Sequence, residues 1–136
     1  MLELLQRERG EQLLRAVGES HYQSALEEVC GRRGRSWTEV NCEVTAILVP
    51  EPTNDYDANA VMVTVGGRHV GYLSRNDAKA YADVIALAHE LGARPACRAL
   101  ICGRGEGSET RNLGIFLDLA EPQNALRDLE RSATGD

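Results

Sequence analysis

The sequence predicts a mainly β, α+β domain of six short strands and two helices, with a further helix before it and a polar tail after it. Three patterns carry this prediction: apolar residues at every second position from 40 to 48 within the run 40–49, a Gly66-Gly67 hairpin signal between two apolar runs, and helical spacing of apolar residues over 77–91. A length of 136 residues fits one such domain.

The beginning of the chain predicts two helices and a short strand. Residues 1–17 carry several leucines among charges, which favours an amphipathic helix. These leucines are Leu2, Leu5, Leu13 and Leu14. Residues 17–19 are typical of a short strand, and Ser20 is suited to cap a helix over 22–30.

The middle of the chain predicts three consecutive strands. Residues 40–49 form a long strand that ends at two prolines, because proline cannot donate a hydrogen bond to a sheet. Residues 53–59 have the composition of a turn. Strands over 60–65 and 69–73 then flank the Gly66-Gly67 hairpin.

The last part of the chain predicts a helix, two strands and a tail. Ser74 or Asn76 is placed to cap the helix over 77–91. Strands over 95–102 and 113–119 follow, and the tail begins as a short helix through Ala125, Leu126 and Leu129 before it frays. Strands this short must close into a small barrel or pack against the helices to hide their edges.

Composition and charge narrow the function classes. The net charge of −6 counts against a generic nucleic-acid coat, since proteins that grip many phosphates are usually basic. Without a signal peptide or a membrane-spanning run, we expect a cytoplasmic protein. The four cysteines have no metal-ligand spacing, so we expect reduced thiols and no metal or cofactor. No nucleophile–base or phosphate-loop signature is present, so we expect no enzyme activity.

One combination of motifs is more specific than these patterns. The string Glu51-Pro52-Thr53-Asn54-Asp55-Tyr56-Asp57-Ala58-Asn59-Ala60-Val61 is followed, one strand and one hairpin later, by Val70-Gly71-Tyr72-Leu73. Upstream lies Val17-Gly18-Glu19-Ser20-His21-Tyr22. This combination resembles the HIRAN domain family over about residues 16–119.

The resemblance implies an OB-like six-stranded barrel with two inserted helices. The predicted division is an N-terminal amphipathic helix at 1–16, a HIRAN-like domain at 17–120 and a polar C-terminal tail at 121–136.

The resemblance also implies capture of the 3′ end of single-stranded DNA, in DNA repair or at a replication fork. The implied site consists of His21, Tyr22, Asn54, Tyr56, Asp57, Tyr72 and Arg75. In it Tyr56 offers a face to the terminal base, Asp57 accepts a hydrogen bond from the free 3′ hydroxyl, and Arg75 meets a phosphate. A helicase or nuclease on another chain is the implied partner, and RNA stays open as an alternative ligand.

Plainer interpretations stay open beside this one. In these interpretations Tyr56 packs over its turn, the Asp57 side chain only caps the turn, and Arg75 is only a solvated residue at a helix start. Trp37 is a packed anchor or a base platform, and the arginines at 32, 33 and 35 form a solvated loop or a phosphate track. Asp55 stands where the family often has proline and adds negative charge. A protein-interaction module without DNA binding, dimerising through the N-terminal helix, is the alternative function.

Overall fold

The computed structural model describes residues 2–7, 11–30, 40–104 and 112–134. These described residues form seven strands, four α-helices and one short 3₁₀ helix. In chain order they are β1 (Leu2–Leu4), β2 (Leu14–Arg15), η1 (Glu19–His21), α1 (Gln23–Val29), β3 (Val40–Pro50), β4 (Val61–Val65), β5 (Arg68–Tyr72), α2 (Arg75–Ala80), α3 (Ala82–Glu90), β6 (Arg94–Arg104), β7 (Asn112–Asp118) and α4 (Pro122–Thr134). The predicted arginine loop, Trp37 and most of the segment between the predicted strands over 95–102 and 113–119 lie outside the described residues.

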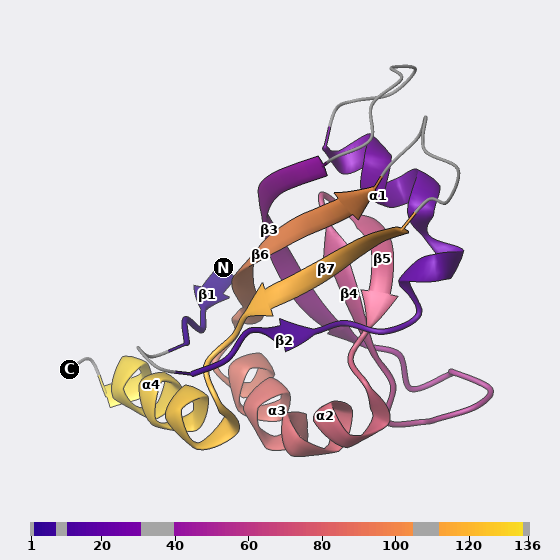
Figure 1. Cartoon of the computed structure of the whole chain (residues 1–136). Coiled ribbons are helices and arrows are strands. Elements are labelled where there is room, and N and C mark those ends of the chain that lie inside the picture. The colour runs from indigo at the N-terminus through magenta and orange to yellow at the C-terminus, as the bar shows by residue number, and fades with distance from the viewer. Residues whose placement is uncertain (1, 8–10, 31–39, 105–111, 135–136) are drawn as a thin grey trace.

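The strands form one curled sheet in the order β2-β7-β6-β3-β4-β5, with β1 added in parallel to β6. The remaining neighbours are antiparallel. Val17, two residues beyond β2, exchanges two backbone hydrogen bonds with Tyr72 of β5, at 2.8 and 2.9 Å. One short segment therefore joins the two outer strands of the sheet. The predicted OB-like α+β fold is confirmed (Figure 1).

Gly71 makes this junction possible. A Cβ atom at position 71 would lie 3.1 Å from the Val17 carbonyl oxygen and 3.6 Å from the Ala16 Cβ. The 3.1 Å distance is tighter than an ordinary van der Waals contact, so the Val17 carbonyl would have to shift to admit a side chain. The glycine of the Val-Gly-Tyr-Leu string thus favours the close approach that closes the barrel, while Val70 and Leu73 of the same string are buried in the core.

The core lies inside the curl and is built from the alternating faces of the strands. In β4 every second residue is buried, as a period of two requires. At one end of the barrel α2, α3 and α4 lie together, and α1 lies at the other (Figure 1). The predicted helix over 77–91 is divided at Tyr81, whose hydroxyl donates a 2.8 Å hydrogen bond to the Ala120 carbonyl. Ser74, of the two predicted candidates, caps α2 through the Asp77 N–H.

The N-terminal amphipathic helix predicted over 1–16 is wrong. In its place lie two short strands, β1 and β2, which belong to the barrel. Leu5 is fully buried, donates its N–H to the Ala96 carbonyl and accepts from the Ala120 N–H. Pairing with distant strands satisfies the backbone and outweighs the weak helical spacing of the leucines. The predicted dimer contact through this helix loses its basis.

The predicted C-terminal tail is a helix through most of its length. After Pro122, which is tolerated in a first turn, α4 continues to Thr134. Ala125 and Leu129 are fully buried, one turn apart on the face that packs against α3. Burial of this face stabilises a helix that its polar composition alone does not predict.

Two of the four cysteines are bonded, which corrects the prediction that all are reduced. Cys30, just after α1, and Cys42 in β3 form a disulfide with Cα atoms 6.2 Å apart. Cys97 and Cys102 of β6 are free, as predicted, and Cys97 is buried. Within the described part of the chain, no helix combines the length and the apolar character that crossing a membrane requires.

Candidate nucleic-acid interface

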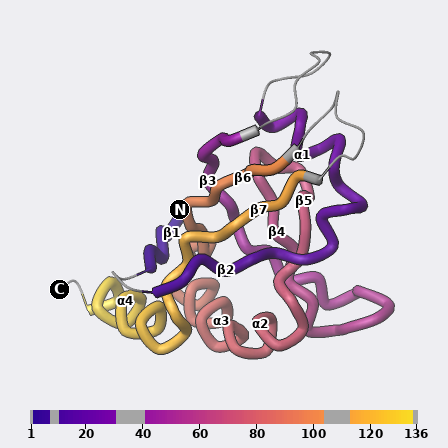
Figure 2. The backbone as a smooth tube through the Cα atoms, viewed as in Figure 1, coloured from indigo at the N-terminus to yellow at the C-terminus, as the bar shows by residue number. Residues whose placement is uncertain are grey.

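The segment between β3 and β4 leaves the barrel and returns as a hydrogen-bonded turn (Figure 2). Asn54 organises it: its Oδ1 accepts the backbone N–H groups of Tyr56 and Asp57, each at 2.9 Å. The Asp57 Oδ1 in turn accepts the Asn59 N–H at 2.9 Å. Asn and Asp favour such turns because their side chains replace backbone acceptors. The predicted turn chemistry is confirmed.

Glu51 connects this turn to β5. One of its carboxylate oxygens accepts the Asn54 side-chain amide at 2.6 Å and the Tyr72 hydroxyl at 2.8 Å. These two hydrogen bonds lower the pKa of Glu51 below its ordinary 4.5. Burial, followed by the hydrogen bond to Glu51, raises the pKa of Tyr72 to about 12. At neutral pH the pair is therefore a carboxylate held by a neutral phenol.

His69 joins the two tyrosines of the predicted site. Its ring lies 4.3 Å from the Tyr22 ring at a 32° tilt, and 4.6 Å from the Tyr72 ring in an edge-on arrangement. His69 is not among the site residues that the resemblance implies, so sequence reasoning missed this contact. The contact depends on a β-bulge between β4 and β5, which the sequence pattern does not indicate.

Tyr56 and Arg75 lie on the outer side of the turn. Tyr56 is 88% exposed, which excludes the interpretation that it packs over its own turn. Arg75 at the start of α2 is exposed, and its guanidinium lies 3.5 Å from the Tyr56 carbonyl oxygen. The guanidinium and the aromatic ring are therefore presented by neighbouring segments.

A continuous series of pairwise contacts links all seven predicted site residues. It begins at His21, whose ring centroid lies 6.5 Å from that of Tyr22, and continues through His69 and Tyr72 to Glu51. Glu51 then contacts Asn54 of the turn, and Arg75 reaches the turn at the Tyr56 carbonyl. We call this group the turn site. Its members are His21, Tyr22, Glu51, Asn54, Tyr56, Asp57, His69, Tyr72 and Arg75.

Tyr22 is positioned by the η1–α1 segment. Gly18 adopts a φ of 76° before η1, a left-handed conformation that glycine takes without strain. Gln23, next to Tyr22, donates its side-chain amide to the Leu113 carbonyl at 2.9 Å and accepts the Leu113 N–H at 2.9 Å. These two hydrogen bonds to β7 fix the start of α1 to the barrel.

Glu19, also in η1, is buried beside Gly114, with Arg15 3.6 Å from its carboxylate. Burial raises the pKa of Glu19 above 4.5, although Arg15 acts against it. A carboxyl group with a raised folded-state pKa favours the folded state most below pH 4.5, and this contribution is lost as pH rises through the folded pKa.

We therefore expect the neutral isostere Glu19→Gln to gain stability relative to the wild type between pH 4 and pH 7. Urea unfolding at the two pH values measures this change. Arg15→Gln is the matched variant: since Arg15 lowers the pKa of Glu19, its loss should steepen the decline of stability with rising pH. A gap between Glu19→Gln and wild type that is equal at pH 4 and pH 7 would contradict the assignment.

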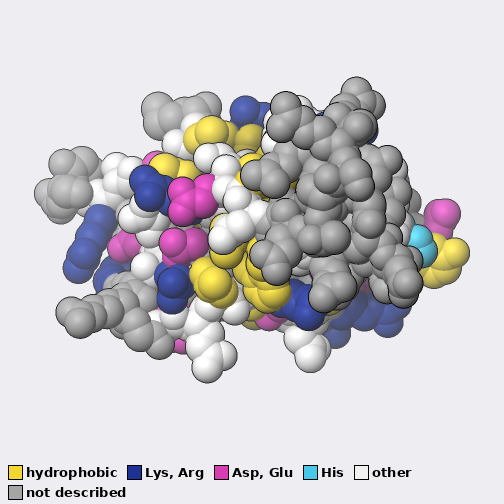
Figure 3. Space-filling model, turned by 45° about the horizontal axis from the view of Figure 1, so that its top comes forward, with side chains coloured by type: hydrophobic (Ala, Val, Ile, Leu, Met, Phe, Trp, Pro, Cys, Tyr) yellow, Lys and Arg dark blue, Asp and Glu magenta, His cyan; other side chains and the backbone are white. Residues whose placement is uncertain are grey.

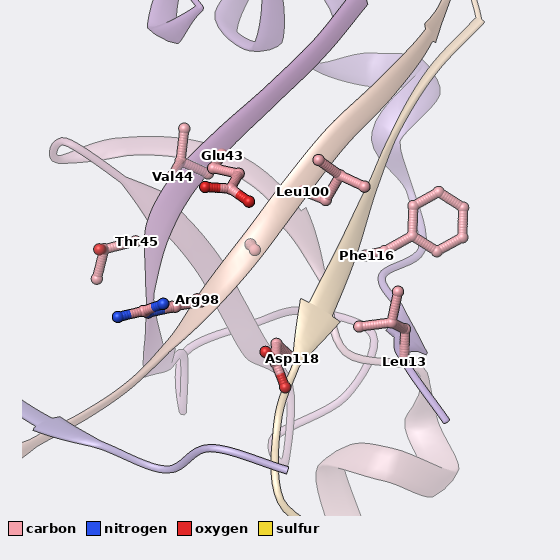
Figure 4. A pocket seen from close by; sticks show the side chains of 9 residues that line it. Leu13, Glu43, Val44, Thr45, Arg98, Leu100, Phe116 and Asp118 are labelled. Atoms are coloured by element: carbon pink, nitrogen blue, oxygen red, sulfur yellow. The ribbon is translucent and has the colours of Figure 1, made fainter. Parts of the chain in front are cut away.

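A separate hollow of 590 Å³ lies on the outer face of β3, β6 and β7. Leu100 and Phe116 line it together with Glu43, Arg98 and Asp118 (Figure 4). None of the predicted site residues lines this hollow. Acidic, basic and hydrophobic side chains lie beside one another on the face shown in Figure 3, so charge there is mixed.

Fold and site together define the class: an OB-like α+β barrel that presents a hydrogen-bonded turn and an aromatic cluster beside its closing strands. The sequence model of the HIRAN domain family matches residues 10–91, more than half of the 136-residue chain. The chain belongs to the HIRAN domain family and is a nucleic-acid-binding module. No curated protein and no solved structure matched the chain. Among the described residues, no group of three metal-ligating side chains gathers.

Proposed function

We propose that this domain captures the 3′ end of single-stranded DNA at the turn site. One observation carries the proposal: Asn54 holds the backbone N–H groups of two consecutive residues, Tyr56, whose side chain is exposed, and Asp57, whose side chain is a carboxylate. An exposed ring offers a stacking surface for a base, and the neighbouring carboxylate offers an acceptor for a hydroxyl. The backbone of both residues is held before any ligand arrives, which lowers the cost of ordering the turn on binding.

The chemistry of the strand end supports Asp57 as the group that recognises the 3′ hydroxyl. A free 3′ hydroxyl is a hydrogen-bond donor, whereas an internal phosphodiester has no donor at that oxygen. One Asp57 oxygen already accepts the Asn59 N–H, and its other oxygen has no hydrogen-bond partner among the described residues. A terminal hydroxyl supplies that partner, and a 3′ phosphate instead places negative charge against the carboxylate.

The remaining groups account for affinity without sequence preference. Every base has a face that stacks on Tyr56, and stacking contributes about 1–3 kcal/mol per base. Arg75 lies beside Tyr56, where its guanidinium is placed to meet a backbone phosphate. A few such contacts suit a protein whose net charge is −6, because they do not require a broad basic surface.

The proposed activity is binding alone. In this proposal the domain holds a strand end in the cytoplasm, in DNA repair or at a replication fork. A helicase or nuclease on another chain then acts on that end. Family membership supports the nucleic-acid ligand, and the geometry of the turn supports the choice of a strand end.

Fluorescence anisotropy with two labelled oligonucleotides of one sequence tests the proposal. We expect the strand with a 3′ hydroxyl to bind about 5- to 150-fold more tightly than its 3′-phosphate counterpart, which corresponds to about 1–3 kcal/mol for one buried polar group. An RNA strand of the same sequence shows whether ribose is accepted. Equal binding of the two DNA strands, or no binding of either at low salt, would refute end recognition.

A further inference from the structure

His69 lies in the turn site because of the bulge between β4 and β5. Gly71 pairs with Val63 and His69 pairs with Thr64, so Val70 is an extra residue in β5. In a regular strand, residues three apart point to opposite faces. With the extra residue, Val70 and Gly71 are buried, while His69 and Tyr72 are both half-buried and their rings meet.

The hydrogen bond of His69 fixes which ring nitrogen carries the proton. Its Nε2 lies 2.9 Å from the Gly71 carbonyl oxygen. A carbonyl oxygen only accepts, so Nε2 must be the protonated nitrogen of the neutral ring. Nδ1 is then the nitrogen that takes up a second proton, and the bond to Gly71 persists when it does.

The ring of His69 contacts two tyrosines. Tyr22 stacks on it at 4.3 Å, and Tyr72 meets it at 4.6 Å with an interplanar angle of 77°. Tyr72 has a second anchor in Glu51, at 2.8 Å. The Tyr22 ring contacts His69 and the more distant His21, and its side chain also interacts with that of Tyr72. Removal of the His69 ring therefore takes away the nearest ring contact of Tyr22, whereas Tyr72 keeps its hydrogen bond to Glu51.

We propose that His69 is a positioning residue of the turn site, whose ring sets the spacing of Tyr22 and Tyr72 and whose protonation strengthens binding of an anionic strand. This inference rests on the proposed function. The charged and titratable groups around it are few: Tyr22 before α1, Tyr72 on β5 and Glu51 after β3, whose carboxylate feels the charge of His69. Its sequence neighbour Arg68 is paired with Glu28 of α1.

A first experiment needs no ligand. In NMR spectra of the free protein, His69→Gln is expected to shift the Tyr22 ring resonances, because the stacked ring that shields them is gone. His69→Phe keeps a ring in that place and should shift them less. His89→Gln, an exposed histidine on α3, is the matched control and should leave them unchanged. Tyr22 resonances that do not respond to His69→Gln would overturn the positioning role.

A second experiment measures binding of a 3′-hydroxyl oligonucleotide at pH 5.5 and pH 8. His69→Gln should bind roughly 3- to 10-fold more weakly than wild type at pH 8, the effect of losing aromatic contacts of about 0.5–1.5 kcal/mol. His69→Phe should stay within about twofold of wild type at pH 8. Wild-type binding should tighten towards pH 5.5, where histidine gains charge, and His69→Phe should lose that gain.

His21→Gln separates the two histidines of the site, and it should keep the tightening towards pH 5.5. If His69→Phe keeps the pH response of the wild type, or if His69→Gln binds as well as wild type at pH 8, the inference is wrong while the proposed function stands. If the wild type binds no oligonucleotide at either pH, the proposed function fails and the binding role of His69 fails with it.

Discussion

Leu5→Ala is expected to lower the free energy of unfolding by about 2–5 kcal/mol, the range for a large-to-small change in a well-packed core. Leu5 has 0% exposure, although it stands five residues from the start of the chain. Its backbone is bonded on both sides, to Ala96 and Ala120. A side chain held this firmly leaves a cavity that its neighbours cannot readily fill. Urea unfolding followed by circular dichroism measures the loss.

Leu2→Ala is the matched control, because Leu2 begins β1, the strand directly before Leu5, but is 42% exposed. We expect its effect to stay within about 0.5 kcal/mol, as for most surface substitutions. An N-terminal amphipathic helix would make the two leucines similar in effect. Equal losses for Leu2→Ala and Leu5→Ala would therefore contradict the β1 strand.

Asp57→Ala is expected to weaken binding of a 3′-hydroxyl strand by about 1–3 kcal/mol, since it removes the proposed acceptor of the terminal hydroxyl. Binding of a 3′-phosphate strand should not fall, because the carboxylate repels that group. The substitution also removes the acceptor of the Asn59 N–H. Asp57→Asn keeps an oxygen for that bond and separates the loss of charge from the loss of the turn.

Asp55→Ala is the control for general electrostatics. Asp55 is exposed on the same turn and carries the same charge. If the carboxylates act only through long-range repulsion, both alanine variants should bind DNA more tightly than wild type. Specific recognition predicts opposite outcomes: weaker binding for Asp57→Ala, and equal or tighter binding for Asp55→Ala.

Local patterns were sufficient where neighbouring residues determine the structure. Alternation placed β3 to within one residue of its observed end, and the Gly66-Gly67 hairpin has the positive φ angles, 57° and 79°, that its glycines permit. Gly92, the residue after the predicted helix over 77–91, likewise has a φ of 73°. The turn chemistry around Asn54 also follows from adjacent residues.

The missed features depend on contacts distant in the sequence. Residues 2–4 form the strand β1 because they pair with residues 94–96. The spacing of the leucines does not indicate that partner. The disulfide needs Cys30 and Cys42 to be brought together by packing of α1 against the barrel. His69 reaches the turn site through a one-residue bulge, which reverses the face that simple alternation assigns to it.

Recognition of a free 3′ end by Asp57 is tested most directly by one comparison: the affinity ratio of 3′-hydroxyl to 3′-phosphate oligonucleotides, measured for wild type and for Asp57→Ala in the same buffer. We expect a ratio of about 5–150 for the wild type, equivalent to about 1–3 kcal/mol, and a ratio near 1 for Asp57→Ala. A ratio that is unchanged by the substitution would show that the Asp57 carboxylate does not read the strand end.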